Sequence, residues 1–141
     1  MRLNVLLISN QVRGIDGAGG LGDVAAALPK ALARRGDVDV RVLTPGFGRV
    51  SGKGVEDRFE RRLASFDIPF GNGSLAMEAY RYALPRLADD EPEVPCYLLR
   101  APVFDEPDRD SADKAVALCR GAVEFMRRGA DFHVDLVHCN D

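Results

Sequence analysis

The sequence predicts an α/β fold in which a mostly parallel sheet is flanked by helices. The near-continuous apolar run Leu3–Ser9 is typical of a central strand that is covered on both faces. A glycine-rich turn and a segment with helical spacing of apolar residues follow it, and Val38–Leu43 then alternates as a strand does. Strand, helix and parallel strand form a βαβ unit, which is almost always right-handed.

The first helix is expected at about Gly22–Arg35. Its apolar positions recur at helical spacing, and Gly36 can adopt the left-handed conformation that ends a helix. Pro29 removes one backbone hydrogen bond, so we expect a kink there. The basic residues late on this helix are expected to form a solvated face: Lys30, Arg34 and Arg35.

A β-hairpin is expected as an insertion in the middle of the chain. Two extended segments, Arg58–Phe70 and Ser74–Leu84, flank the turn sequence Gly71-Asn72-Gly73, which is a strong hairpin signal. The glycine-rich stretch Gly46–Gly54 before them predicts an exposed loop.

The last third predicts further elements of the same sheet. They are a loop at Leu87–Pro95, a strand at Val94–Leu99, a loop at Pro102–Asp110, a helix at Ala112–Arg128 capped by Gly129, and a strand at Val134–His138. A parallel strand needs a helix to cover it. We therefore expect residues 1–141 to be part of a larger Rossmann-like domain.

Composition limits the classes of function. The chain has 141 residues, 46% of them apolar and 29% charged, with a formal net charge of −3, as in an ordinary globular domain. The mild acidity argues against nucleic acid as a partner, and no apolar run approaches the roughly 20 residues of a membrane span. We therefore expect a cytoplasmic protein with neither partner.

The cysteines and histidines give no metal signature. Cys96, Cys119 and Cys139 lack metal or redox spacing and are expected to be reduced, buried thiols. Since no cluster of histidine, cysteine and aspartate has ligand spacing, we expect no metal and no organic cofactor.

The segment Gly17–Val24 is the strongest functional signal. A glycine-rich turn that opens a helix presents backbone N–H groups at the positive end of the helix dipole, which suits a phosphate. By spacing alone, a tight turn that only starts a helix is as good an interpretation. Gly17-x-Gly19-x-x-Gly22 also matches a dinucleotide fingerprint, but seven residues separate it from the strand and the acid after the second strand is missing. No Gly-Lys-Ser/Thr follows, which excludes a P-loop.

Several segments together resemble bacterial glycogen synthases and plant starch synthases. They are Gly19–Val24, Ala27–Leu32, Asp39–Pro45, Val94–Leu99, Phe104-Asp105, Asp110-Ser111 and Asp135–Asp141. The resemblance covers nearly the whole chain, most clearly its first 45 and last 10 residues. It implies the GT-B architecture, in which two Rossmann-like domains enclose the active site.

The resemblance implies glucosyl transfer from ADP-glucose to the O4 end of an α-1,4-glucan, with retention of anomeric configuration. This chain would be part of the N-terminal, acceptor-side domain, and ADP-glucose, the glucan and a missing C-terminal domain would be its partners. The second domain of the family supplies most of the nucleotide pocket, so we expect this chain alone to be inactive or nearly so.

The resemblance also assigns substrate-binding residues, without a confident catalytic one. They are Gly19, Gly20, Asp23, Asp110, His138, Asn140 and Asp141. Two positions depart from the family pattern, because Gly17 stands where the family has a lysine and Asn140 where it has a histidine. Loss of one preorganised electrostatic donor costs about 3 kcal/mol in the transition state, and asparagine cannot accept a proton near neutral pH.

Plainer roles exist for the same residues. Asp23, an acid in a first helical turn, can simply stabilise the helix dipole, and Asp110 can be the N-cap of the helix that follows it. His138 can be a hydrogen-bonded histidine at the edge of the sheet, where its strand ends. The chain could accordingly be a non-catalytic glucan- or nucleotide-binding domain that acts through a partner. It could also be a structural or regulatory domain in which the glycine turn is only architecture; a nicotinamide-binding module is the least favoured alternative.

Overall fold

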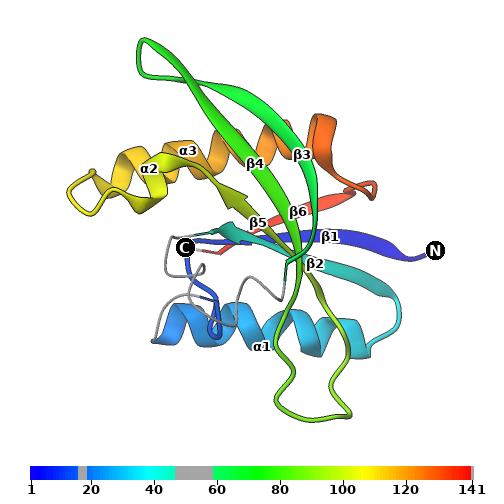
Figure 1. The fold of residues 1–141 in the computed structure, drawn as a ribbon. Coiled ribbons are helices and arrows are strands. Elements are labelled where there is room, and N and C mark those ends of the chain that lie inside the picture. Colours follow the sequence, from blue (N-terminus) through cyan, green and yellow to red (C-terminus); the bar gives the residue numbers. More distant parts are fainter. Residues whose placement is uncertain (16–18, 47–58, 141) are drawn as a thin grey trace.

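The computed structural model describes residues 1–15, 19–46 and 59–140, and for 59–61 only the backbone (Figure 1). The expected loop at Gly46–Gly54 lies almost entirely outside the described residues, as do Gly17 and Asp141. Within the described part, no helix is both long enough and apolar enough to cross a membrane.

A six-stranded mixed sheet forms the centre of the molecule, with strand order β3-β4-β5-β2-β1-β6. Its strands are β1 (Leu3–Ser9), β2 (Val38–Pro45), β3 (Phe59–Phe70), β4 (Gly73–Ala83), β5 (Pro95–Arg100) and β6 (Leu136–Asn140). β5, β2, β1 and β6 run parallel, whereas β4 pairs antiparallel with both β3 and β5. The predicted α/β fold with a hairpin insertion is thereby confirmed.

Both faces of the sheet are covered by helices. α1 (Gly20–Arg34) lies on one face, while α2 (Pro102–Asp105) and α3 (Ser111–Glu124) lie on the other (Figure 1). The last turn after α3 widens into a π-helical segment, η3 (Phe125–Gly129). Neighbouring residues of the parallel strands alternate between two buried clusters: Leu6 and Leu43 pack on the α3 side, and Leu7 and Val42 on the α1 side.

Lys30 of α1 is buried, so the expectation of a solvated face is wrong for this residue. Only 6% of it is exposed, and its Nζ donates to the Pro85 carbonyl and to Glu91 Oε2, both at 2.7 Å. The helix face that carries Lys30 is covered by the connection between β4 and β5, which this ammonium anchors. Arg34 and Arg35 are exposed as expected.

The hairpin forms as the turn sequence predicts. β3 and β4 are joined across Gly71, whose φ of 58° is a left-handed conformation that suits glycine. β4 pairs with β5 from Ala83–Pro95 to Glu78–Arg100, where the pairing ends. Beyond that point the hairpin projects past the rest of the sheet (Figure 1).

The segment Pro102–Asp110, expected as a loop, begins with the short helix α2. Pro102 occupies the first turn, where its missing N–H leaves no hydrogen bond unmade. Val103 and Phe104 of this helix are buried. This apolar pair is too short to show a helical period in the sequence.

Gly129 does not cap the helix, contrary to the expectation, and its φ is not positive. It belongs to η3, and a Cβ there would lie 2.9 Å from Ala64 Cβ of β3. The glycine is therefore needed for close approach to the hairpin. Gly36, in contrast, has φ 80° as expected for the end of α1.

The cysteines differ in burial. Cys96 is buried as expected, and burial raises the pKa of its thiol. Cys119 and Cys139 are exposed, so the expectation of buried thiols is wrong for these two. Cys119 lies on the outer side of α3, and Cys139 on the edge strand β6.

Candidate functional site

The topology gathers most of the predicted site residues along one edge of the molecule. β1 and β6 are parallel neighbours, so Ser9 and Asn140 lie side by side at their carboxyl ends. α1 starts after β1 and therefore begins at this edge, as Figure 1 shows. α3 also begins there, on the opposite face of the sheet. Ligands of open α/β sheets bind beyond this edge.

The N-terminus of α1 is open. Gly19 is its N-cap residue with φ 128° and ψ 177°, and no side chain of the described residues caps the helix. A Cβ built on Gly19 or on Gly20 would have no heavy atom of the described structure within 4 Å. The first N–H groups of a helix have no partner within the helix, so this end can present donors to an incoming anion.

Asp23 lies in the first turn of α1 and pairs with Arg13 from the preceding loop. Arg13 Nη1 lies 2.7 Å from Asp23 Oδ1, and both side chains are exposed. The Arg13 N–H also donates to the Gly22 carbonyl at 3.0 Å, which folds the loop back onto the helix. Because Arg13 and Asp23 have opposite charges, the pair adds no net charge at this end of α1, where the helix dipole is positive.

Asn140 carries an unusual amide. Its Nδ2 atom is buried and has no hydrogen-bond partner among the described residues. Such orphaned donors are rare and call for an explanation, such as a ligand or an ordered water. His138, two residues earlier on β6, lies on the same face of the sheet and is exposed.

Asp110 acts as the N-cap of α3. Its Oδ1 accepts a hydrogen bond from the Ala112 N–H at 2.9 Å, and Lys114 N–H donates to its carbonyl at 3.2 Å. The plainer role suggested by the sequence is therefore present. The other carboxylate oxygen leaves room for a second role at the same edge.

A large hollow lies where β4 leaves β5, and it was not predicted from the sequence. Its volume is about 980 Å³. It is lined by the hairpin, the end of β5 and α2: Ser65, Phe66, Asp67, Ala76, Met77, Glu78, Tyr80, Arg100, Ala101, Pro102, Asp105, Glu106 and Pro107. The Tyr80 hydroxyl donates to the Glu78 carboxylate, which raises the pKa of Tyr80, and burial adds to that increase. No local pattern in β4 could have indicated the hollow, because it depends on where the pairing of β4 with β5 ends.

A second polar cluster lies away from this edge, near the start of β5. Arg41 Nη1 donates to the Tyr97 hydroxyl at 2.6 Å and lies 3.1 Å from Asp131 Oδ1, while Arg81 Nη1 lies 2.9 Å from Asp131 Oδ2. The Arg41 guanidinium is also 4.1 Å from the centroid of the Phe132 ring. These contacts fasten the segment between η3 and β6 to the sheet, so we assign them a structural role.

No group of three or more histidine, cysteine, aspartate or glutamate side chains within the described ranges could hold a metal ion.

Comparison with known proteins gives a consistent result. A family model described as the starch synthase catalytic domain matches residues 4–141. Glycogen synthase 2 of Geobacter metallireducens is 32% identical over 99% of this chain, and glycogen synthase of Photobacterium profundum is 31% identical over the same share. The chain spans 28% and 27% of the length of these two relatives.

One solved structure has the same fold. The catalytic domain of starch synthase IV from Arabidopsis thaliana, bound to ADP and acarbose, matches with a TM-score of 0.78 and 20% identity. The match covers 99% of this chain and 28% of that chain.

Proposed function

Because this chain belongs to the starch synthase catalytic domain family, we propose that it forms the acceptor-side, N-terminal part of a glucosyltransferase. The reaction would move glucose from ADP-glucose to the O4 end of an α-1,4-glucan, in the cytoplasm. The glycogen synthase relatives support this reaction, and the starch synthase bound to ADP and acarbose supports the choice of ligands. Residues 1–141 would be part of one of two Rossmann-like domains.

The open N-terminus of α1 is the observation that carries this proposal. Gly19 and Gly20 are exposed, and among the described residues no atom would meet a Cβ on either glycine and no side chain occupies the cap. A diphosphate placed there would accept hydrogen bonds from the first amides of α1 and would face the positive end of the helix dipole. Asp23, held by Arg13, would orient the turn rather than bind the anion.

Asn140 would contribute a neutral donor at the same edge. Its Nδ2 lacks a partner among the described residues and is suited to the oxygen of a sugar hydroxyl. His138 and Asp110 would line the glucan side, and Asp141 would extend it. All of these groups bind and position substrate, and none is assigned as a nucleophile.

The site would be weaker electrostatically than that of a typical member of the family. Gly17 stands where the family has a lysine, so one cation is missing beside the diphosphate. Preorganised charges of this kind contribute about 3 kcal/mol to a transition state. This departure favours a second candidate, a non-catalytic domain that binds glucan or nucleotide and acts through a partner.

Titration of the chain with ADP, ADP-glucose and a maltooligosaccharide tests the proposal. We expect ADP to bind weakly, in the millimolar range, and to shift the amide resonances of Gly19 and Gly20 in heteronuclear NMR spectra. Submillimolar ADP affinity would contradict the expected weakness. Shifts confined to another part of the chain would remove the assignment to α1.

A pair of variants sharpens this test. Gly20→Val places a branched side chain in the open space at the start of α1, without a positive φ to strain. Ala27→Val places the same side chain at an exposed position within α1. We expect Gly20→Val to abolish the ADP-induced shifts and Ala27→Val to preserve them.

A transfer assay separates the two candidates. The assay needs a protein that carries this chain together with the remaining length typical of its relatives. Incorporation of glucose from ADP-glucose into glucan supports the transferase, and binding without incorporation supports the non-catalytic domain.

A further inference from the structure

Lys30 carries a buried charge that the proposed function does not use. Among the residues whose side chains the structure describes, it is the only charged residue that is buried. Its Nζ donates to the Pro85 carbonyl and to Glu91 Oε2, both at 2.7 Å. A buried ion pair is weak evidence for stability, because apolar side chains of similar volume often replace it without loss. The presence of a cation here is better explained by the segment that it holds.

That segment is the connection between β4 and β5, and its hydrogen bonds converge on Lys30 and its partners. Glu91 Oε2 accepts from the Leu87 N–H at 2.8 Å as well as from Lys30, and the Glu91 N–H donates to the Ala88 carbonyl at 3.1 Å. We call Lys30, Pro85 and Glu91 the Lys30 cluster. This cluster fastens the connection to the third turn of α1.

Pro85 in turn contacts the segment that leads from β1 to α1. Gly14 of this segment has φ 92°, and a Cβ there would lie 3.1 Å from Pro85 Cγ. Glycine is therefore favoured at this position both by the backbone conformation and by the close approach of the proline ring. Val12 is fully buried in the same cluster as Leu84, which precedes Pro85, and Ile15 packs against that cluster.

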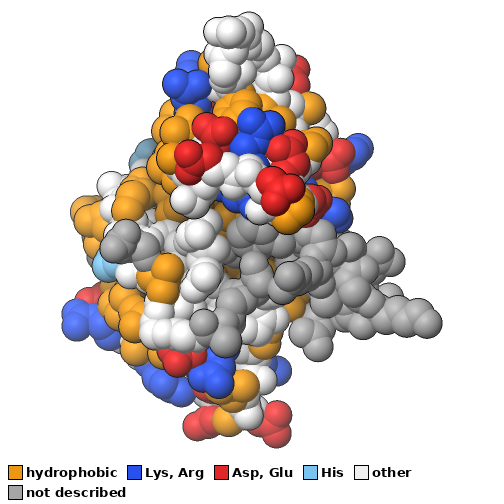
Figure 2. Space-filling view, turned by 90° about the vertical axis from the view of Figure 1, so that its left-hand side faces the viewer, with side chains coloured by type: hydrophobic (Ala, Val, Ile, Leu, Met, Phe, Trp, Pro, Cys, Tyr) orange, Lys and Arg blue, Asp and Glu red, His pale blue; other side chains and the backbone are white. Residues whose placement is uncertain are grey.

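The turn Val12–Ile15 also contacts the first turn of α1. The Arg13 N–H donates to the carbonyl of the buried Gly22 at 3.0 Å, and Arg13 Nη1 lies 2.7 Å from Asp23 Oδ1. Figure 2 faces the side of the molecule at which α1 begins and shows acidic and basic side chains near one another in its lower part. The turn is thus held between the Lys30 cluster and the start of α1.

Distance excludes a direct action of Lys30 on a ligand at the start of α1. Both residues belong to α1, and Lys30 follows Gly20 by ten positions, which corresponds to about 15 Å along a helix. The Debye length at physiological ionic strength is about 8 Å, so screening weakens the field of Lys30 over this distance. Its influence on the start of α1 must pass through contacts.

We propose that Lys30 is a positioning residue for the anion-binding start of α1. Acting through Pro85 and Gly14, it holds the turn Val12–Ile15 against the first turn of the helix. Without the ammonium, the connection is released, Gly14 loses its support, and Arg13 no longer fixes the first turn. This inference deepens the proposed function and rests on it for the identity of the anion.

Two variants interrupt this path at different points. Lys30→Met removes the ammonium and keeps an unbranched apolar side chain in the buried site. Pro85→Ala removes the ring that faces Gly14 and keeps the carbonyl that accepts from Lys30. The second variant leaves the buried ion pair intact, so the path can be tested even if Lys30→Met fails to fold.

Two controls separate positioning from charge and from stability. Arg34→Met removes a positive charge from an exposed position on the same helix. Gly121→Ala disturbs the packing of α3 against Met77 and Leu99, and none of these residues belongs to the Lys30 cluster or the turn. Circular dichroism and thermal unfolding verify that each variant folds.

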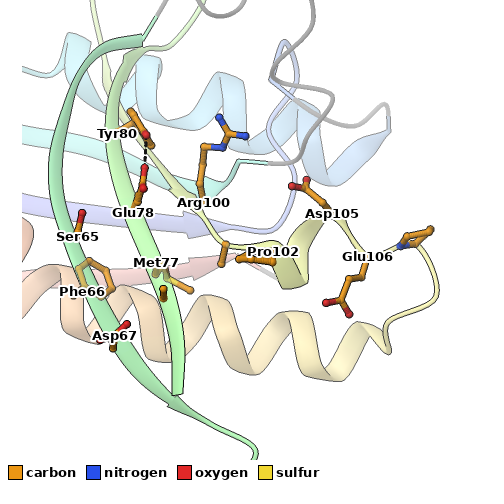
Figure 3. Close-up of a pocket in the computed structure, with 13 residues that line it drawn as sticks. Ser65, Phe66, Asp67, Met77, Glu78, Tyr80, Arg100, Pro102, Asp105 and Glu106 are labelled. Atoms are coloured by element: carbon orange, nitrogen blue, oxygen red, sulfur yellow. Dashed lines mark hydrogen bonds between the residues drawn. The ribbon is translucent and has the colours of Figure 1, made fainter. Parts of the chain in front are cut away.

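The hydrogen exchange rate of the Arg13 amide measures the support of the turn in the free protein. We expect Lys30→Met and Pro85→Ala to raise this rate at least about fivefold, and both controls to change it by less than about twofold. Ser65 and Asp105 at the hollow serve as internal references for the Lys30→Met protein. The hollow, shown in Figure 3, is lined by no residue of the Lys30 cluster, so their amide resonances should stay in place.

The affinity for ADP measures the effect on the start of α1. In the titration followed at Gly19 and Gly20, we expect Lys30→Met and Pro85→Ala to weaken ADP binding at least about threefold, with both controls within about 1.5-fold of the parent. An unchanged Arg13 exchange rate in the folded variants would overturn the positioning role. So would faster exchange combined with unchanged ADP affinity, since Lys30 would then hold only the connection.

The failure of this inference can be told from the failure of the proposed function. If ADP does not shift Gly19 and Gly20 in the parent chain, the donor site fails, and the exchange rate of Arg13 alone decides whether Lys30 supports the turn. If ADP binds the parent and both variants with equal affinity, the donor site stands and the positioning role fails.

Discussion

At the scale of single residues, Asp131 illustrates how burial and pairing compete. Burial of the carboxyl group would by itself raise its pKa. The hydrogen bond from Tyr97 and the charges of Arg41 and Arg81 act in the opposite direction and leave the pKa of Asp131 below its usual value. The carboxylate is therefore held in its charged form by the neighbours that it fastens to the sheet.

The lowered pKa predicts how acid affects stability. A carboxyl group whose pKa is lower in the folded state stabilises the fold above its unfolded value of about 3.9, and this contribution disappears as pH falls through the folded value. We expect Asp131→Asn to reduce the free energy of unfolding at pH 7 and to flatten its decline below about pH 4. Urea denaturation between neutral and acidic pH measures both effects.

Asp89→Asn is the control for this prediction. Asp89 is exposed in the connection between β4 and β5, away from Asp131 and its partners. This variant should leave the acid profile of the parent unchanged. An Asp131→Asn profile parallel to that of the parent would show that the cluster does not hold the carboxylate in its charged form.

At the scale of elements, local sequence patterns predicted those helices, strands and turns whose conformation depends on residues close to them in the sequence. The turn at Gly71 and the apolar run of β1 were readable because a hairpin turn and a central strand have local signatures. Lys30 was misread because its partners, Pro85 and Glu91, come from a distant connection that no helical pattern describes.

The candidate site was predictable in one part and not in another. The start of α1 is open because Gly19 and Gly20 have no side chains there, and both glycines can be identified from the sequence alone. The hollow depends on where β4 and β5 separate, and that register is set by long-range strand pairing. The N-cap role of Asp110 was readable, because an aspartate before a helical pattern is a local signal.

The packing of α3 on the sheet yields a prediction at this same scale. Gly121 lies on the inner side of α3, where an added Cβ would come within 3.0 Å of Leu99 Cδ1 and 3.1 Å of Met77 Cε, and closer still to Met77 Sδ. Overpacking of this kind costs about 1–3 kcal/mol. We expect Gly121→Ala to lower the free energy of unfolding by that amount, as measured by urea denaturation.

Gly73→Ala provides the comparison. A Cβ on Gly73 would meet nothing within 4 Å, and its φ is not positive. Its effect should stay within about 0.5 kcal/mol, as for an ordinary surface substitution. If Gly121→Ala were equally mild, α3 would not be packed as closely on β4 and β5 as the structure indicates.

At the scale of the whole molecule, burial is uneven across the sheet. β2 lies between β1 and β5, and Val40, Val42 and Leu43 are almost fully buried. β6 lies at the edge and pairs with β1 alone among the described strands. Leu136 and Val137, which point to opposite faces of the sheet, remain 45% and 40% exposed.

This gradient predicts the order of local opening. Segments with few buried apolar contacts open at lower free energy than the core, so β6 should separate from β1 before the centre of the sheet unfolds. Native-state hydrogen exchange measures this directly. We expect the hydrogen-bonded amides of β6 to exchange at least about tenfold faster than those of β2. Equal protection of the backbone amides in the two strands would mean that the sheet opens as one unit. The Asn140 side chain at the end of β6, whose Nδ2 has no partner among the described residues, would then be held as rigidly as the core.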